Sequence, residues 1–295
     1  MNVALASISD AAGRRPALVV DGKVHALPTS APSWAHESLD AIVARWDEAS
    51  GLIDDWASQV EAPLADQKLS SPTRPVRIFA AASNYVEHAE EMGTVLEAKK
   101  DSAPYMFTKV SSTVIGPGDV VRIPHESSKV DWEVELAVVI GRRGRRISAD
   151  HALEHVAGYT VVNDISARDL TRRSDYPFKF DWFQGKNFDT FLPMGPWIVP
   201  AAAIDDPQRL RLRLDVNEET MQDASTAEMI FDVREQIAYL SSLATLEPGD
   251  IIATGTPTGV GMGRGIFLKP GDVMTAWIEN IGALTNPVEA EDGAA

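Results

Sequence analysis

Two glutamates stand at the start of a stretch that otherwise has the composition of a buried strand. The run Asp131-Trp132-Glu133-Val134-Glu135 continues directly into Leu136-Ala137-Val138-Val139-Ile140. Because side chains at positions i and i+2 of a strand leave the same face, Glu133 and Glu135 are expected about 7 Å apart, pointing in one direction. One face of this strand is predicted to be apolar throughout, whereas the other changes from acidic to apolar along its length.

This acidic pair needs a positive partner, since two like charges beside a buried strand repel each other and lose hydration. The ordinary alternative is a solvated outer face of an antiparallel strand, where alternating Glu is common. A third carboxylate favours a metal site, because Asp164 ends the strand-like run 158–164, and strand ends often present ligands from a rigid scaffold. Glu133, Glu135 and Asp164 are therefore predicted to hold Mg²⁺ or Mn²⁺, with Ca²⁺ also compatible, because oxygen ligands suit hard cations better than Zn²⁺.

His88 and Glu91 form a second candidate pair. They lie three residues apart in the segment 84–97, which is predicted to be a helix capped by Ser83 or Asn84. A carboxylate on the same helix face can orient the imidazole and raise its basicity, as activation of a water molecule requires. The alternative is a solvated acidic helix end with an incidental histidine.

Three further segments carry polar or flexible residues whose roles stay open at this level. Lys186, in a mixed polar and aromatic segment, is a candidate for binding an oxyanion or a carboxylate, or is a solvent-facing lysine. The glycine-rich stretch 254–263 follows a strand and can offer backbone N–H groups to an anion, or is an irregular loop. It has no Gly-Lys-Ser/Thr, and it is not expected to open a helix as a dinucleotide fingerprint does. The basic run 142–146 is interpreted as a solvated turn.

Composition excludes several classes of function. A net charge of −16 and a pI near 4.8 argue against a nucleic-acid or anionic-membrane partner, which would require a concentrated basic surface. The absence of cysteine excludes disulfides and thiolate chemistry. No apolar stretch approaches the ~20 residues of a membrane span, and the first residues do not read as a secretory signal, so a cytoplasmic location is expected. Neither a Gly-x-Ser-x-Gly elbow nor a His-Glu-x-x-His motif is present.

Hydrophobic spacing and turn residues predict an α+β, β-rich fold with covering helices. A small N-terminal β/α domain is predicted over 1–70 and a catalytic domain over 71–295. The N-terminal part is expected to contain a hairpin over 16–27 and helical patches near 39–46 and 52–60, with a proline-rich linker at 70–75. In the rest, short strands alternate with helices expected at 84–97, 151–155 and 233–243.

From about residue 74 to 288 the order of segments resembles the fumarylacetoacetate hydrolase superfamily. The matching stretches are Asn84-Tyr85 followed by His88 and Glu91, Asp131 to Glu135 before the apolar run, Asn163-Asp164-Ile165-Ser166-Ala167-Arg168-Asp169, Gly185-Lys186, Gly195-Pro196, and Pro248-Gly249-Asp250 leading to Thr254-Gly255-Thr256-Pro257. The resemblance implies a mixed β-roll, usually dimeric or higher, with Mg²⁺ or Mn²⁺ held by residues that match Glu133, Glu135 and Asp164. A homodimer is expected.

The resemblance also implies roles for individual residues. His88 and Glu91 become the water-activating dyad, and Lys186 a group that stabilises negative charge. Tyr85, Lys186 and Thr256 become substrate-binding candidates. Arg168 and Asp169 are expected to form a structural ion pair.

The chain departs from parts of the family pattern. A further Asp ligand, found seven residues before the catalytic histidine in the tyrosine-catabolic hydrolases, is replaced here by Ala81, which implies a three-carboxylate site as in the acylpyruvate hydrolase branch. Thr171 stands where many members have Gln, and the segment 172–183 is longer than in many relatives. Its aromatic residues are expected to pack rather than to form a lid.

The expected activity is hydrolysis of a carbon–carbon bond in a 2,4-dioxo acid, an acylpyruvate or a diketo sugar acid, to a 2-oxo acid and a carboxylic acid. Enolate-forming chemistry is the alternative, such as an oxaloacetate decarboxylase, a 2-hydroxymuconate-type isomerase or a 2-oxopent-4-enoate-type hydratase. A binding protein without catalytic activity is a third hypothesis, which the presence of both His88 and Glu91 disfavours.

Overall fold

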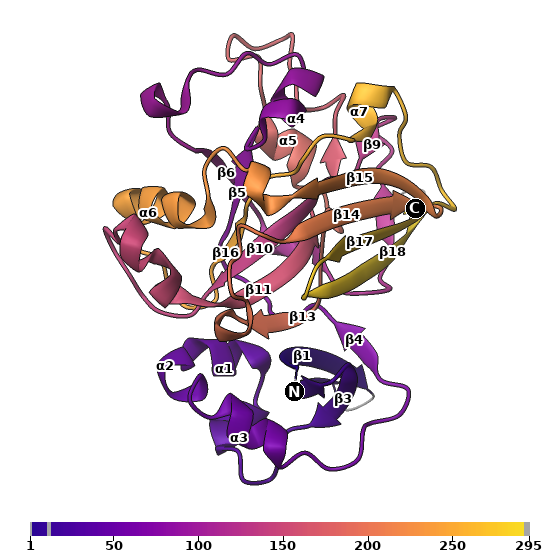
Figure 1. The fold of residues 1–295 in the computed structure, drawn as a ribbon. Coiled ribbons are helices and arrows are strands. Elements are labelled where there is room, and N and C mark those ends of the chain that lie inside the picture. Colours follow the sequence, from indigo (N-terminus) through magenta and orange to yellow (C-terminus); the bar gives the residue numbers. More distant parts are fainter. Residues whose placement is uncertain (1, 11–12, 292–295) are drawn as a thin grey trace.

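The computed structural model describes residues 2–10 and 13–291 of the 295-residue chain. Figure 1 shows a larger upper part, in which two layers of strands face each other, above a smaller part formed by the N-terminal strands and helices. The α+β, strand-rich class predicted from the sequence is confirmed.

The larger sheet has the strand order β3-β2-β1-β13-β11-β10-β16-β5-β6, with β4 added beside β1 and β7 beside β13. Most of its neighbours are antiparallel, but β16 pairs with β5 in parallel. Its strands are β1 (Val3–Asp10), β2 (Gly13–Val20), β3 (Lys23–Ala26), β4 (Lys68–Ser70), β5 (Ile78–Ala82), β6 (Tyr105–Lys109), β7 (Val114–Ile115), β10 (Val134–Ile140), β11 (Val156–Asn163), β13 (Leu192–Pro200) and β16 (Ile251–Ala253).

A smaller sheet has the order β15-β14-β17-β18-β8, and β9 and β12 form a two-stranded ladder. These strands are β8 (Val121–Ile123), β9 (Val130–Asp131), β12 (Ser166–Ala167), β14 (Arg211–Val216), β15 (Glu219–Ser225), β17 (Val273–Ile278) and β18 (Gly282–Ala290). The α-helices are α1 (Leu39–Ala44), α2 (Trp46–Ala49), α3 (Ile53–Ser58), α4 (Val86–Glu91), α5 (Trp182–Lys186), α6 (Val233–Leu243) and α7 (Gly261–Arg264). Short 3-10 helices are η1 (Ser33–His36), η2 (Lys99–Asp101), η3 (Ser111–Thr113), η4 (Ala149–His155), η5 (Ala201–Ala203) and η6 (Thr226–Glu228).

Strand β10 is buried on both faces, as a central strand between two hydrophobic cores must be. Leu136 and its alternate neighbours pack in one core with residues of the smaller sheet, such as Leu214 and Ala276. Ala137 and Val139 lie in the other core, with helix residues that include Trp56. This division confirms the predicted faces of the strand.

The N-terminal part follows the sequence prediction in outline. The hairpin is formed by β2 and β3, and the two helical patches become α1 with α2 and then α3. The strand β1 pairs with β13, with Leu5 opposite Ile198, so the N-terminal strands extend the larger sheet. The predicted linker is fixed in place, because Ser7 Oγ and Arg14 Nη2 both donate to Pro72 O. The division into domains at residue 70 stays a prediction.

The helix predicted over 84–97 is much shorter than expected. Helix α4 ends at Glu91 because Gly93, with φ of +67°, allows Thr94 N to donate to Ala89 O and so closes the last turn. Its N-cap is Tyr85 rather than Ser83 or Asn84. The segment 151–155 is part of the 3-10 helix η4, whereas α6 has the predicted bounds.

The arginines of the basic run 142–146 bind groups of two neighbouring helices, α6 and α2. Arg145 Nη1 donates to two carbonyls at the end of α6, those of Ser241 and Ser242, and Arg142 pairs with Asp47.

No helix of the described chain is long and apolar enough to cross a membrane. The expected homodimer and cytoplasmic location stay predictions.

We expect Leu136→Ala to lower the free energy of unfolding by about 2–5 kcal/mol, because it leaves a cavity in β10 where collapse is resisted on both faces. Urea denaturation followed by circular dichroism measures the change. Leu243→Ala is the matched control, since Leu243 is 63% exposed at the end of α6, and it should cost far less. Equal costs for the two variants would contradict a tightly packed β10.

Candidate metal centre and catalytic cavity

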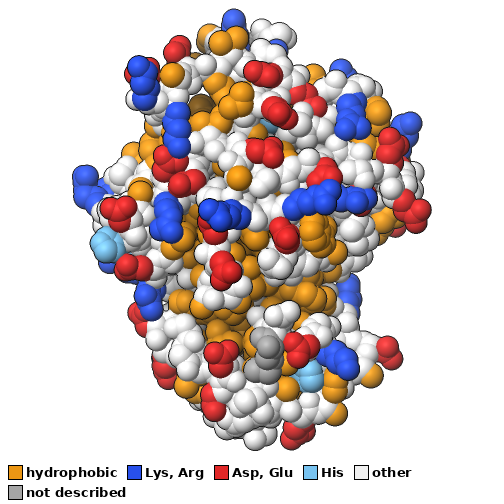
Figure 2. Space-filling model, in the orientation of Figure 1, with side chains coloured by type: hydrophobic (Ala, Val, Ile, Leu, Met, Phe, Trp, Pro, Cys, Tyr) orange, Lys and Arg blue, Asp and Glu red, His pale blue; other side chains and the backbone are white. Residues whose placement is uncertain are grey.

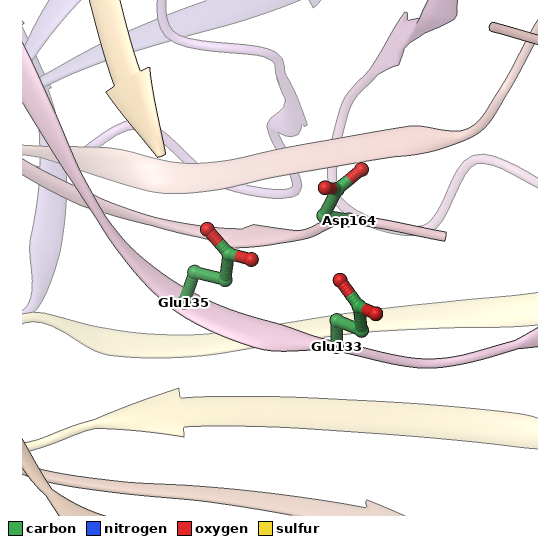
Figure 3. A group of neighbouring side chains, drawn as sticks. All are labelled: Glu133, Glu135 and Asp164. Carbon is green, nitrogen blue, oxygen red and sulfur yellow. The ribbon is translucent and has the colours of Figure 1, made fainter. Parts of the chain in front are cut away.

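The antiparallel pairing of β10 with β11 brings the three predicted ligands together. The register places Val134 opposite Asn163, so Glu133, just before β10, meets Asp164, just after β11. The N–H of Asp164 donates to the carbonyl of Glu133 at 2.8 Å, which continues the ladder by one step. Figure 3 shows the side chains of Glu133, Glu135 and Asp164 converging, and one oxygen of each lies within 4.8 Å of the others.

Three buried cations surround these carboxylates. Lys186 Nζ lies 2.6 Å from Glu133 Oε2 and 2.7 Å from Asp164 Oδ2. Lys109 Nζ lies 2.6 Å from Asp164 Oδ1 and donates to the carbonyl of Lys186. Arg168 Nη2 lies 2.7 Å from Glu133 Oε1. Although burial opposes ionisation, Lys186 and Arg168 hold the pKa of Glu133 well below its usual range.

The predicted ion pair between Arg168 and Asp169 is wrong. Arg168 instead reaches Asp131, with Nε 2.8 Å from Oδ2, as well as Glu133. Asp169 turns the other way and accepts hydrogen bonds from Ser127 Oγ and Ser128 N. Arg168 therefore belongs to the charged cluster, whereas Asp169 does not.

Glu135 differs from the other two carboxylates. No ion pair of Glu135 is found among the residues that the structure describes, and its Oε2 accepts a hydrogen bond from Gly255 N at 2.7 Å. Burial, followed by the charges of Asp164 and Glu133, raises the pKa of Glu135 well above its usual value. Its ionised form therefore has no ion-pair partner among the described residues, and the charge of Lys186 offsets it only in part.

This imbalance fits a divalent cation. The buried carboxylates of the cluster outnumber its buried cations by one; they are Asp131, Glu133, Glu135 and Asp164, against Lys109, Arg168 and Lys186. A divalent ion between Glu133, Glu135 and Asp164 would offset the excess and leave one positive charge for an anionic substrate. Three carboxylate donors suit Mg²⁺ or Mn²⁺ with open coordination positions, so the residues present fit the predicted metal.

The glycine-rich loop after β16 does bind anions, and they are the protein's own carboxylates. Gly255 N donates to Glu135, and Gly259 N donates to Glu91 at 3.1 Å. Gly261 N, at the start of α7, donates to Asp131 at 2.7 Å. The expectation that this stretch opens no helix is wrong, because α7 begins at Gly261. The loop thereby fixes carboxylates from three other parts of the chain.

His88 lines a cavity of about 340 Å³, which Glu133, Arg168 and Lys186 also line. His88 Nδ1 lies 3.4 Å from Glu91 Oε2, and the imidazole is 5% exposed. Although partial burial opposes it, hydrogen bonds from His88 and from Gly259 N lower the pKa of Glu91, so this carboxylate stays ionised. Nε2 of His88 remains as the ring nitrogen that can exchange a proton with a ligand.

The predicted substrate-binding residues have different positions. Lys186 and Thr256 line the cavity, although Thr256 Oγ1 donates to Val134 O and accepts from Gln222 Nε2. Tyr85 is 2% exposed and does not line the cavity. Its phenol oxygen has no hydrogen-bond partner among the described residues, and its geometry gives no support to contact with a substrate.

Sequence reasoning missed Lys109 and the part that Asn84 plays. Lys109 is the last residue of β6, an edge strand, and the residues next to it in the sequence do not indicate that its ammonium group is buried. Asn84 ties three segments together, because its amide donates to Phe231 O and Thr254 O and accepts from Phe231 N. It holds the start of α4 against the glycine-rich loop and so places His88 over the cavity.

We expect Gly255→Ala to cost about 1–3 kcal/mol of unfolding free energy. Gly255 has φ of +97°, and a Cβ there would lie 2.7 Å from Asn84 Cβ. Gly51→Ala is the matched control, because its nearest atom would be Glu48 O at 3.9 Å and its φ is not positive. Urea denaturation measures both, and an unchanged Gly255→Ala midpoint would contradict the close approach of Asn84 and the loop.

Residues 77–289 match the family described as fumarylacetoacetate (FAA) hydrolase, C-terminal. A mitochondrial oxaloacetate tautomerase of Xenopus laevis is 43% identical over 222 residues, which are 75% of this chain and 67% of that protein. The structure of fumarylacetoacetate hydrolase from Exiguobacterium antarcticum is 34% identical with a TM-score of 0.83, over 98% of this chain and 100% of that one. Maleylpyruvate hydrolase from Sphingobium sp. SYK-6, in complex with manganese(II) ion and pyruvate, is 30% identical with a TM-score of 0.77, over 98% and 100% of the two chains. The sequence match, the shared fold and the acidic cluster together show that this chain belongs to the fumarylacetoacetate hydrolase family.

Proposed function

We propose that this protein is a divalent-metal-dependent enzyme that hydrolyses a carbon–carbon bond in a 2,4-dioxo acid. The observation that carries the proposal is that one cavity is lined both by His88, which pairs with Glu91, and by Glu133, which belongs to the cluster of three carboxylates. The manganese ion and pyruvate bound by the maleylpyruvate hydrolase support a divalent metal and a 2-oxo acid as ligands of this chain.

Glu133, Glu135 and Asp164 would hold the cation, Mg²⁺ or Mn²⁺. When bound, it supplies Lewis-acid polarisation of the 2-oxo group and a counter-charge for the substrate carboxylate. Arg168 and Lys186 already lie within 2.7 Å of Glu133, so they keep that ligand ionised and oriented. They also place positive charge where the substrate develops negative charge.

His88 would act as the general base. Its Nε2 takes a proton from water while Glu91 fixes the ring through Nδ1, and the hydroxide adds to the 4-oxo carbon. The bond between C3 and C4 then breaks, its electron pair goes to the enolate of the 2-oxo acid, and C4 leaves as a carboxylic acid. His88 returns the proton to C3, which completes the balance of atoms and charge.

Keto–enol tautomerisation of a dicarboxylic 2-oxo acid is the second candidate, and the 43% identity to an oxaloacetate tautomerase favours it. This reaction uses the same groups without water attack, because His88 would take a proton from C3 and deliver it to the 2-oxo oxygen, with the reverse transfer converting the enol to the keto form. Hydrolysis and tautomerisation therefore differ in whether the bond to C4 breaks.

We expect metal binding to depend on Glu135. Isothermal titration with Mn²⁺ should show that Glu135→Gln weakens binding at least about 10–100-fold, a loss typical even of groups outside the ligand set. Glu126→Gln serves as the control, because Glu126 is an exposed glutamate close in the sequence to the ligands. Chelation of the metal should abolish turnover. Undiminished Mn²⁺ affinity in Glu135→Gln would refute the proposed ligand set.

We expect His88→Ala to lose turnover by about 10²–10⁴-fold while Mn²⁺ affinity changes little, because it removes the base and leaves the ligands. The assay follows loss of enol absorbance for acylpyruvates, diketo sugar acids and oxaloacetate, together with the 2-oxo acid and carboxylic acid released. The matched control is His151→Ala, since His151 and Glu154 form an i,i+3 pair at the surface, 2.8 Å apart.

The products decide between the two candidates. Stoichiometric 2-oxo acid and carboxylic acid support hydrolysis, whereas absorbance loss without cleavage products supports tautomerisation. Metal-dependent ligand binding with no turnover of any substrate would support a binding protein and contradict both.

A further inference from the structure

The cavity has a second, aromatic part that neither candidate reaction requires. Its wall beyond the charged cluster includes Tyr105, Phe107, Phe180 and Trp182. Figure 2 shows hydrophobic side chains gathered at the upper end of the molecule, in the region where α4, α5 and β6 lie in Figure 1. Phe180 is 51% exposed, which is unusual for a large aromatic side chain and makes this wall a surface that a ligand can cover.

These side chains form a continuous row that starts at the charged cluster. Lys186 Nζ lies 5.6 Å from the ring centroid of Phe107. The rings of Phe107 and Trp182 stack with centroids 5.4 Å apart, and those of Trp182 and Phe180 stack at 6.2 Å, only 12° from parallel. The guanidinium of Arg172 lies 5.2 Å from the centroid of Phe180 and ends the row. All five residues line the one cavity.

Helix α5 holds this aromatic row in a fixed position next to the charged cluster. Trp182 and Lys186 are the first and last residues of α5, four positions apart, so they share one face of the helix. Asp181 caps α5 by accepting from Gln184 N, and Arg173 lies 3.2 Å from Asp181. The aromatic residues of the longer segment 172–183 are expected to pack rather than to form a lid, and Phe180 and Trp182 do pack against each other, at the wall of the cavity.

A flat substituent suits such a row better than an aliphatic chain does. Aromatic and conjugated groups gain from offset stacking on a ring face in addition to the area they bury. The enol form of an aroylpyruvate is planar from its carboxylate to its ring, so one rigid molecule can span the charged cluster and Trp182. Oxaloacetate, with four carbons, carries no group that would contact the row.

We propose that the row Phe107, Trp182 and Phe180 is a subsite for an aromatic or conjugated acyl group, so that the substrate class is aroyl-type 2,4-dioxo acids. The assignment of a substrate rests on the proposed function, whereas the subsite itself can be tested by binding alone. Trp182 is the residue that determines specificity, because it is the middle ring of the row, in contact with both Phe107 and Phe180, and lines the cavity.

The first test compares benzoylpyruvate with acetopyruvate in steady-state kinetics. For Trp182→Leu we expect kcat/KM to fall about tenfold or more for benzoylpyruvate and to change little for acetopyruvate, as loss of stacking plus buried area implies. Phe183→Leu is the matched control, since Phe183 is the next residue of α5, is 65% exposed and does not line this cavity. Equal losses on both substrates would overturn the subsite.

The second test needs no turnover. Isothermal titration in the presence of Mn²⁺ compares oxamate with N-phenyloxamate, an inert planar analogue that carries the same charge and adds one ring. We expect the wild type to bind N-phenyloxamate about tenfold or more tightly than oxamate, and Trp182→Leu and Phe180→Leu to lose most of this preference. No preference in the wild type, or an unchanged preference in both variants, overturns the subsite. A retained preference without turnover of either acylpyruvate would refute hydrolysis and leave the subsite standing.

Discussion

The antiparallel pairing of β10 with β11 is the constraint on which the rest of the site depends. It sets Glu133 against Asp164, and the hydrogen bond between their backbones fixes the two side chains at one point on the sheet. Both strands are buried along their whole length, so their ends cannot shift without disturbing two hydrophobic cores. A slip of one residue would reverse the faces and move Glu133 and Glu135 into the core between the sheets.

The glycine-rich loop supplies hydrogen bonds to carboxylates around the site. Buried carboxylates need hydrogen bonds or counter-charges, and backbone N–H groups supply the former without adding a titratable side chain. Gly255, Gly259 and Gly261 each serve a different carboxylate. A loop that reads as a ligand-binding motif is thus used to position the groups of the site, which explains why its glycines approach other chain segments so closely.

The predictions for individual residues succeed where a local sequence pattern decides the position and fail where contacts between distant segments decide it. The faces of β10 and the positions of Glu133 and Asp164 at strand ends follow from local properties of the sequence, whereas the pairing of β10 with β11 brings the two carboxylates together. The family resemblance implies that Arg168 pairs with Asp169, its neighbour in sequence, but Arg168 pairs with Asp131 and Glu133 through contacts that form only when β9 and β12 meet. Lys109 gave no signal, because burial of a lysine depends on partners far along the chain.

By itself the sequence determined the strand-rich class, the family resemblance, the acidic ends of two central strands and the i,i+3 relation of His88 to Glu91, because periodicity and short spacing encode these directly. The tertiary structure alone decided that Lys109, Lys186 and Arg168 converge on the carboxylates and that Phe180 and Trp182 face the cavity rather than a core. The physical reason is that the burial of a residue and the charges around it depend on residues far away in the sequence. These residues come into contact only when the chain has folded.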